Sequence, residues 1–379
     1  MLSAQCSMLL TIISFLLVLT VLVLVHELGH FLTAKFFGVK VEEFGFGFPP
    51  RAWGKKIGET IYSLNWLPIG GFVKLYGEDE AGGGSIKISN PKLQISQKDA
   101  KRAFFAQPVW KRFVIVFAGV FMNFALATVL LTYLVGAQGI PAAGKDVVVA
   151  EVVHNTPAEK AGLRQGDIVL QVDNQKLASP DQLISYTKTH QGKQISLVVK
   201  TKDNNVKTIF VTPRVHYPAN QGAMGIAVGS NVVVRRFAWY LWPYVGLREA
   251  LSQSWLILAG LGQLLAQLFT KGQIPQGLAG PVGIAQITGQ FVQMGANATL
   301  SLVALLSLNL AILNVLPIPA LDGGRLFFIV YEAIFRRKIS PKYEGYAHAI
   351  GMAFLLALIA LITLHDIIRI ATGGSILPK

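Results

Sequence analysis

Four long stretches of the chain consist almost entirely of apolar residues, and polar residues gather in the segments between them. The stretches cover about 8–31, 113–135, 300–316 and 347–364. A helix of about 20 apolar residues crosses the hydrocarbon layer of a bilayer, and the shortest spans have about 17. The pattern therefore predicts an α-helical polytopic membrane protein with about four transmembrane helices.

The longest connection has a different pattern, in which apolar and polar residues alternate over short runs. The runs DVVVAEVV (146–153) and QISLVVK (194–200) alternate as half-buried strands do. Between them lies a short helical segment that ends at Gly162 and a Gly-Asp turn. We expect an inserted α+β domain at 145–230. Aromatic and apolar residues follow at 237–295, where we expect amphipathic helices that lie in the membrane interface; the alternative is an additional span.

Composition and charge agree with a membrane protein and set its orientation. Of the 379 residues, 52% are hydrophobic and 14% are charged, whereas soluble domains carry about a quarter charged residues. Basic residues crowd the first and third connections, among them Lys111, Arg112, Arg336 and Arg337. The positive-inside rule places these connections in the cytoplasm, so both termini and the inserted domain lie outside it.

The net charge of +14 does not indicate nucleic-acid binding, because no basic run is interleaved with aromatic residues. We assign the excess charge to cytoplasmic flanks and to contact with anionic lipid headgroups of the bilayer. Cys6 is the single cysteine, which excludes an internal disulfide and a cysteine-rich zinc site.

The first connection also contains an apolar stretch with turn residues at its centre. The sequence ETIYSLNWLPIGGFVKLYGED (59–79) is typical of a strand, a Pro-Ile-Gly-Gly turn and a second strand. We therefore predict a cytoplasmic β-hairpin at about 59–79, close after the first span.

Ionisable residues interrupt the first span where the sequence reads HELGH. His26 and His30 are four residues apart, so they lie on one face of a helix and can bind one metal ion. Neutral imidazole suits Zn²⁺, and Glu27 stands where a general base for water is needed. In soluble chains HExxH often arises by chance, but buried ionisable groups inside a span are costly and indicate function.

A catalytic zinc site needs a third protein ligand. The sequence NVLPIPALDGGR (314–325) contains Asp322, the first charged residue after the uncharged tract 272–321. Pro317 and Pro319 break the helix, and Gly323 lets backbone approach closely. Broken backbone at membrane depth is tolerated around a cavity or inside protein. We interpret this segment as a pocket wall with one carboxylate; the alternative is that Asp322 caps the following helix.

Together, HExxH in the first span and NxxPxPxLDGG before the last span resemble the site-2 proteases, which are intramembrane zinc metalloproteases. The stretches FAGVFMNF (117–124) and LPIGGFVKLYGE (67–78) resemble motifs of the bacterial, RseP-like branch, the second being its membrane-reentrant hairpin. The sequences AGLRQGD (161–167) and QGAMGIAV (221–228) resemble the signature and the carboxylate-binding loop of a circularly permuted PDZ domain. The chain has room for a single PDZ domain, whereas well-known members carry two.

The resemblance implies four groups of site residues. Zn²⁺, one per chain, would be held by His26, His30 and Asp322, with Glu27 as the catalytic base. Residues that would bind substrate are Asn314, Pro317, Pro319, Gly323, Ile61, Leu64, Gly70, Gly71, Phe72, Val73, Gly119 and Asn123. For Gly119 and Asn123, helix packing alone is the alternative. Peptide binding by the PDZ domain would use Gly222, Ala223, Met224, Gly225 and Ile226, unless this domain binds no ligand.

The resulting hypothesis is a protease of the bacterial cytoplasmic membrane that performs regulated intramembrane proteolysis. Residues 1–136 and 296–379 would form its membrane part. It would cut single-span proteins, such as anti-sigma factors or remnant signal peptides, after a first cut by another protease, and the PDZ domain would bind the new C-terminus or exclude large substrates. The alternatives are a metal or ion transporter and an inactive PDZ-bearing scaffold.

Overall fold

The computed structural model describes residues 2–78, 100–218, 221–271 and 279–372, and its chain forms two compact units. One unit contains residues 1–137 and 238–379, and the other is the inserted segment Gln138–Phe237. Each unit is described by itself.

Four helices of the described chain are long and apolar enough to cross a membrane. They are α1 (Leu2–Phe36), α3 (Val109–Gln138), α8 (Ala296–Val315) and α10 (Pro341–Ala371). Each overlaps one of the apolar stretches that predicted it. α1 packs closely against α3, since a side chain at Gly29 would collide with the carbonyl of Ala118.

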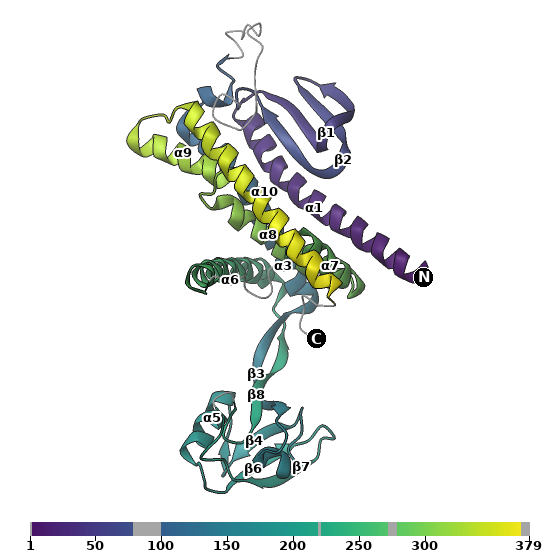
Figure 1. Cartoon of the computed structure of the whole chain (residues 1–379), viewed down its shortest axis with the longest axis vertical. Coiled ribbons are helices and arrows are strands. Elements are labelled where there is room, and N and C mark those ends of the chain that lie inside the picture. The colour runs from purple at the N-terminus through teal and green to yellow at the C-terminus, as the bar shows by residue number, and fades with distance from the viewer. Residues whose placement is uncertain (1, 79–99, 219–220, 272–278, 373–379) are drawn as a thin grey trace. The chain divides into compact units, whose positions relative to one another are not determined.

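A small sheet follows α1 and consists of β1 (Val41–Ile57) and β2 (Thr60–Leu75) (Figure 1). A tight turn at Gly58 joins 51–57 to the antiparallel segment 60–65. Residues 43–46 lie between two parts of β2. They pair with 61–64 in parallel register and with 71–74 in antiparallel register. The segments 51–57 and 71–75 are therefore the two edges of the sheet.

The predicted hairpin at 59–79 is wrong in its pairing. The chain does reverse direction between 64 and 71, around the Pro-Ile-Gly-Gly sequence, but the two arms pair with 43–46 and not with each other. The tight hairpin lies at Gly58, and the strand that precedes it, 41–57, was not predicted. In 41–57, glycines, prolines and charged residues interrupt the alternation that a strand prediction needs. Asp79 lies outside the described residues.

An ion-pair cluster connects this sheet to both neighbouring helices. The carboxylate of Glu59, in the turn, accepts two 2.7 Å hydrogen bonds from the guanidinium of Arg102 and one of 3.1 Å from Lys35. Lys35 lies in the last turn of α1, and Arg102 precedes the 3-10 helix η2 (Phe104–Ala106) and α3. Hydrogen bonds from Arg102 and Lys35 outweigh partial burial and lower the pKa of Glu59 to about 2.

The region predicted as interfacial helices contains η3 (Trp239–Leu241), α6 (Trp242–Lys271) and α7 (Pro281–Gln293). α6 packs its small residues on α3: Gly246 lies against Thr132, and Ala250 belongs to a buried cluster with Leu131 and Leu308 of α8. Its position in the interface stays a prediction.

A buried carboxylate inside the last span has a structural role. Asp366 of α10 is fully buried and accepts 2.8 Å hydrogen bonds from the backbone N–H groups of Gly280 and Gly283 at the start of α7. Its other oxygen pairs with Arg369 at 2.7 Å. The carboxylate thus satisfies helix N-terminal donors that have no partner within their own helix.

The inserted unit is an α+β domain. Its antiparallel sheet has the order β7-β6-β4-β3-β8, with β5 paired to β4. The strands are β3 (Ile140–Val152), β4 (Ile168–Val172), β5 (Gln175–Lys176), β6 (Ile195–Lys200), β7 (Val206–Val211) and β8 (Ile226–Arg235), and the helices are α4 (Pro157–Lys160) and α5 (Pro180–Thr189). The unit is longer than the predicted 145–230, because β3 and β8 continue as a pair to Ile140 and Arg235.

Candidate active site

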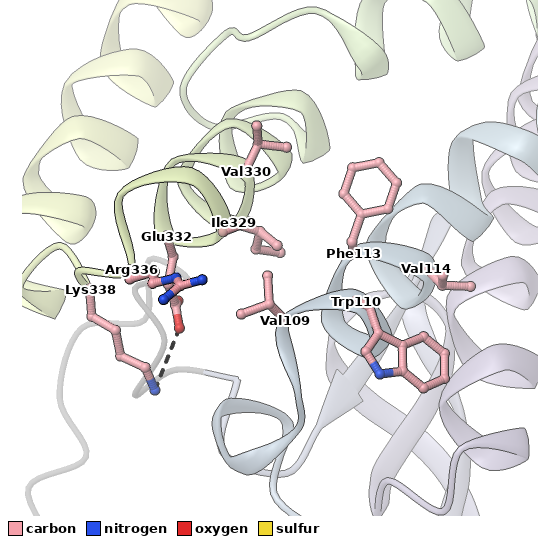
Figure 2. A pocket seen from close by; sticks show the side chains of 10 residues that line it. Val109, Trp110, Phe113, Val114, Ile329, Val330, Glu332, Arg336 and Lys338 are labelled. Carbon is pink, nitrogen blue, oxygen red and sulfur yellow. Dashed lines mark ion pairs between the residues drawn. The ribbon is translucent and has the colours of Figure 1, made fainter.

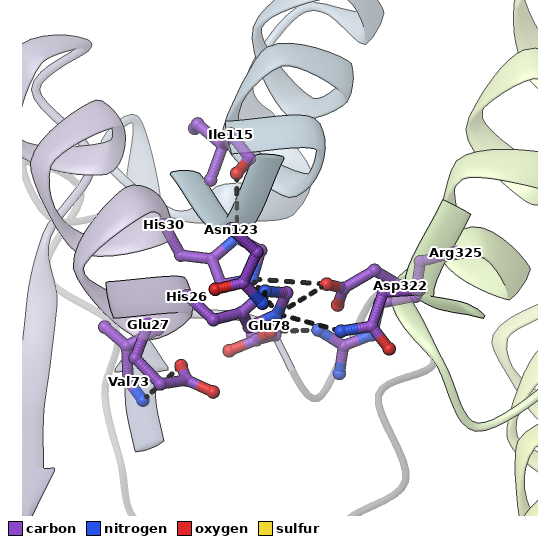
Figure 3. A network of polar contacts seen from close by, with 10 residues as sticks. His26, Glu27, His30, Val73, Glu78, Ile115, Asn123, Asp322 and Arg325 are labelled. Carbon is purple, nitrogen blue, oxygen red and sulfur yellow. Dashed lines mark hydrogen bonds and ion pairs between the residues drawn. The ribbon is translucent and has the colours of Figure 1, made fainter. Parts of the chain in front are cut away.

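Three of the predicted site residues meet where α1 faces the start of α9 (Asp322–Phe335) (Figure 3). The Nε2 atoms of His26 and His30 are 3.2 Å apart. Oδ2 of Asp322 lies 2.8 Å from Nε2 of His26 and 3.4 Å from Nε2 of His30. Both histidine side chains are 10% exposed. Three side chains remote in sequence therefore present their ligand atoms to one small volume.

The spacing of these atoms fits a metal ion. Zinc bonds of about 2.0–2.1 Å in tetrahedral geometry place neighbouring ligand atoms roughly 3.3 Å apart. The three observed separations lie near this value. Within the described chain, this is the group of His, Cys, Asp and Glu residues whose ligand atoms come close enough to hold an ion. Three protein ligands leave a fourth position for water or substrate, as in catalytic zinc sites.

Hydrogen bonds to the far sides of the imidazoles support this role. Nδ1 of His30 donates to the carbonyl of Ile115 at 2.9 Å, which leaves Nε2 as an unprotonated ligand atom. Nδ1 of His26 lies 3.4 Å from the side-chain amide of Asn123, whose Oδ1 is buried without a partner in the described structure. Exchanging the amide N and O by a 180° turn lets Oδ1 accept from Nδ1–H of His26.

Gly119 and Asn123 make room for the imidazoles and orient them. A Cβ at Gly119 would collide with Nε2 of His30 and would lie 2.8 Å from Cε1 of His26. Both residues are buried, and Asn123 has no exposed surface. Their place in the structure is behind the histidines, rather than at a surface that substrate could reach.

The segment before α9 brings Asp322 to the histidines. α8 ends at Val315, and a non-helical stretch leads to α9. Gly323 packs on the carbonyl of Leu316, where a Cβ would collide. Asp322 is the first residue of α9, and the N-cap position is Leu321, without a side-chain cap. Because the carboxylate faces the histidines, helix capping does not explain this residue.

Glu27 lies beside the edge of the sheet. Its Oε2 accepts a 3.0 Å hydrogen bond from the backbone N–H of Val73 (Figure 3). In the antiparallel pair of 71–74 with 43–46, this N–H points away from the sheet, toward α1. The outer edge 71–75 therefore faces the helix that carries the histidines and Glu27.

Comparison with known proteins identifies the family. The sequence pattern of peptidase family M50 matches residues 14–358. The chain belongs to peptidase family M50. A Clostridium perfringens protein described as a zinc metalloprotease is 36% identical over 360 residues, which are 94% of this chain and 98% of the relative. The regulator of sigma-W protease RasP from Bacillus subtilis is 30% identical over 425 residues, with 95% of this chain and 99% of RasP covered.

Membership of family M50 confirms the resemblance drawn from the motifs. The chain is a zinc metalloprotease with Zn²⁺ as its cofactor and a multi-pass membrane protein with apolar helices of spanning length. Among solved structures, the PDZ domain of an SdrC-like protein from Listeria monocytogenes covers 24% of this chain and 93% of its own, at 18% identity and a TM-score of 0.21.

The other predicted substrate-binding residues of this M50 member fall into two groups. Asn314, Pro317 and Pro319 lie on the stretch that leads to Asp322, and the amide of Asn314 is 3.5 Å from Nε2 of His26. Gly70, Gly71, Phe72 and Val73 lie on or beside the outer edge of the sheet. Ile61 and Leu64 do not, because both pair with β1 on both sides.

Two charged residues near the site were not predicted. Arg325, one turn after Asp322, forms an ion pair with Glu78, which follows β2 (Figure 3). Glu78 also accepts a 3.2 Å hydrogen bond from the backbone N–H of Leu75. The pair connects the edge segment to α9. A lone arginine after the metal-ligand motif was the available signal, but its partner is 247 residues away in sequence.

The predicted peptide-binding residues of the inserted unit line a groove. It has a volume of about 270 Å³ and lies between α5 and β8, an edge strand of the sheet. Gly222, Ala223, Met224 and Ile226 line it together with Leu183, Ile184, Thr187, Lys188, Tyr217, Gln221 and Val228. Gly225 has φ +78 and packs on Thr156, so it shapes the loop and does not line the groove.

Proposed function

We propose that this protein hydrolyses peptide bonds within the membrane-spanning segments of single-span proteins, after another protease has removed their outer part. The observation that carries the proposal is the position of the histidine–aspartate cluster and Glu27: they lie on helices α1 and α9 of the membrane unit, beside the outer edge of a sheet. The proposed substrates are anti-sigma factors, in keeping with the sigma-W regulation in the name of the similar RasP protein, and remnant signal peptides.

We assign His26, His30 and Asp322 as the zinc ligands. Bound zinc supplies Lewis-acid chemistry, which polarises a carbonyl and allows water to lose a proton near neutral pH. Ile115 and Asn123 hold the imidazoles so that their Nε2 atoms stay available. Glu27 takes the proton of the attacking water and delivers it to the leaving amide nitrogen, and the N–H of Val73 keeps its carboxylate in place.

We propose that substrate binds as an added strand along 71–75. A scissile amide within a helix is shielded by its own hydrogen bonds, and membrane interior offers no water to replace them. Pairing with the backbone groups of this edge that are not bonded to Glu27 or Glu78 satisfies groups of an unwound segment while its carbonyl becomes accessible. Asn314 would donate to substrate backbone beside the metal. Ile61 and Leu64 would contribute through side chains, since their backbones are paired with β1.

The test is cleavage of a single-span model protein by the purified chain in detergent. Wild type should cut it, a zinc chelator should stop the reaction, and added Zn²⁺ should restore it. Glu27→Gln should reduce cleavage by at least a hundredfold, within the range known for general bases, while retaining zinc. Cleavage that persists in Glu27→Gln would contradict the assignment of the base.

For the inserted unit we propose a PDZ domain that binds the C-terminus exposed by the first cut. The edge strand β8 offers backbone groups for pairing, and loop 222–225 lies at its start, where a terminal carboxylate would meet backbone N–H groups. A peptide with an apolar C-terminal residue should bind with a free carboxylate and not as the amide. Ile226→Glu in the groove should abolish binding. Val206→Glu, at the exposed start of β7, should not.

The orientation completes the proposal. The chain would lie in the cytoplasmic membrane of a bacterium, with both termini and the inserted unit outside the cytoplasm and the β1–β2 sheet facing it. Basic residues at the start of α3 and after α9 support this orientation through the positive-inside rule. In a Cys6→Ser background, single cysteines in the insertion and in the β1–β2 turn should be labelled from opposite sides of intact cells.

A further inference from the structure

A groove lies away from the active site, between the start of α3 and the end of α9. Its volume is about 680 Å³, within the range of small-molecule sites. Figure 2 shows Trp110 and Phe113 on one wall, Ile329 and Val330 on the other, and Arg336 and Lys338 at one end. The groove thus has an apolar body and a basic end.

The residues around the groove are typical of the level where a membrane meets water. Val109 is the first residue of α3, one of the candidate spans. Trp110 is 57% exposed, and Lys111 and Arg112 follow it. Tryptophan beside basic residues at the end of a span is typical of the interfacial region. An occupant would therefore have one part among acyl chains and another among headgroups.

The charges at the basic end do not cancel. Arg112 and Glu332 form a buried ion pair at 2.7 Å, which neutralises the carboxylate of the groove. Lys338 is 3.9 Å from the same carboxylate, and its side chain is 66% exposed. In the described part of the chain, the guanidinium of Arg336 has no ion pair or side-chain hydrogen bond. Two cationic side chains thus face a groove that holds one already paired carboxylate.

The backbone conformation of Arg336 sets the end of α9. It ends α9 in the left-handed region with φ +52, a conformation that favours glycine at a helix end. A glycine here would relieve the backbone but would remove the cation from the groove.

We propose that this groove binds an anionic glycerophospholipid. Its phosphate lies at Arg336 and Lys338, and an acyl chain runs along Phe113 and Val330. Apolar lining, interfacial level and unbalanced positive charge each match one part of such a lipid, and basic pockets between membrane helices are known to take acidic headgroups. A zwitterionic lipid would fill the same apolar body but would gain less from the two cations.

The experiment uses the full chain reconstituted in vesicles with brominated acyl chains, which quench nearby tryptophan fluorescence. The quenching that is lost in Trp110→Phe reports this groove. It should be stronger with brominated phosphatidylglycerol, diluted in unbrominated phosphatidylcholine, than with the same amount of brominated phosphatidylcholine. The double variant Arg336→Ala/Lys338→Ala should weaken apparent phosphatidylglycerol binding by about fivefold for each cation removed, with zinc content unchanged.

Arg337→Ala is the matched control, because Arg337 is a neighbouring exposed cation that does not line the groove. It should bind phosphatidylglycerol like wild type. Equal effects of Arg337→Ala and the double variant would reduce the result to general surface charge and overturn the proposal. Equal quenching by the two lipids would overturn it as well. Competition by millimolar inorganic phosphate would identify a free-anion site instead of a lipid site.

Discussion

The zinc site depends on how little space surrounds two imidazole rings. Gly119 lies against His30 and His26, Asn123 lies behind His26, and the carbonyl of Ile115 fixes the proton of His30. Such outer contacts hold a metal ligand in the orientation that binding needs, and losing them commonly lowers metal affinity 10- to 100-fold.

Gly119→Ala should therefore lose zinc. The added Cβ would collide with Nε2 of His30, an atom that we assign as a ligand. We expect zinc affinity to fall by at least tenfold, measured by competition with a chelator. The matched control is Gly260→Ala on α6, where a Cβ would have no neighbour within 4 Å. Normal zinc affinity in Gly119→Ala would contradict the arrangement of the site.

At the residue scale, the sequence predicts the zinc ligands and the catalytic base better than the residues that hold the ligands in place. His26, Glu27 and His30 follow from helical spacing within an apolar segment, and Asp322 stands out as a lone charge. The position of Asn123 behind His26 depends on how α3 packs on α1, which no local pattern encodes. The predicted contact of Asn123 with substrate came from the family resemblance, whereas the Asn123 side chain is fully buried in the structure.

At the scale of elements, the site depends on how the sheet is held against the helices. The ion pair of Glu78 with Arg325 connects the edge 71–75 to α9, so one contact links the strand beside Glu27 to the helix that carries Asp322. We expect this pair to hold the edge 71–75 and Asp322 in a fixed position relative to each other.

Glu78→Gln should lower kcat/KM by roughly tenfold or more, because small displacements of reacting groups are costly. Zinc content should stay unchanged, and the exchange Glu78→Arg/Arg325→Glu should restore part of the activity. The control is Glu42→Gln, which breaks an exposed pair with Lys74 on the same sheet. If both glutamate variants behave alike, the pair does not position the edge.

The Glu59 cluster should make the attachment of the sheet sensitive to acid. Hydrogen bonds from Arg102 lower the pKa of Glu59 from 4.5 to about 2 in the folded protein. Its stabilising contribution is therefore complete above about pH 4.5 and is lost as the pH falls toward 2. The difference in Tm between wild type and Glu59→Gln should shrink over this interval. A difference in Tm that stays constant with pH would show that the Glu59 cluster does not cause acid sensitivity.

The β1–β2 sheet also shows where element prediction fails. Turn residues at Pro68–Gly71 correctly predicted a reversal of the chain, because proline and glycine restrict local backbone geometry. Which strand fills the space between the arms depends on long-range pairing, and 43–46 takes that place. The apolar spans were predictable, since length and hydropathy alone define them.

At the scale of the whole molecule, an α+β domain is inserted into the sequence of a membrane protease but contributes no residue to the zinc site. His26, Glu27, His30 and Asp322 all belong to the membrane unit. The two ends of the insertion meet, because Ile140 pairs with Arg235. A short linker can therefore replace residues 138–237.

Replacing 138–237 with a short Gly/Ser linker should leave zinc content unchanged. If the insertion excludes large substrates, cleavage of single-span proteins that retain their outer part should rise severalfold relative to wild type, in a paired assay of cut and uncut substrate. Unchanged selectivity would show that the insertion does not act as a filter.

The central claim is that His26, His30 and Asp322 hold one zinc ion for hydrolysis. X-ray absorption at the zinc edge of the purified protein tests it most directly. The account predicts two imidazole nitrogens and at least one oxygen at about 2.0–2.2 Å, and a changed first shell or lost zinc in Asp322→Ala. A sulfur neighbour, or a first shell unaltered in Asp322→Ala, would contradict the account.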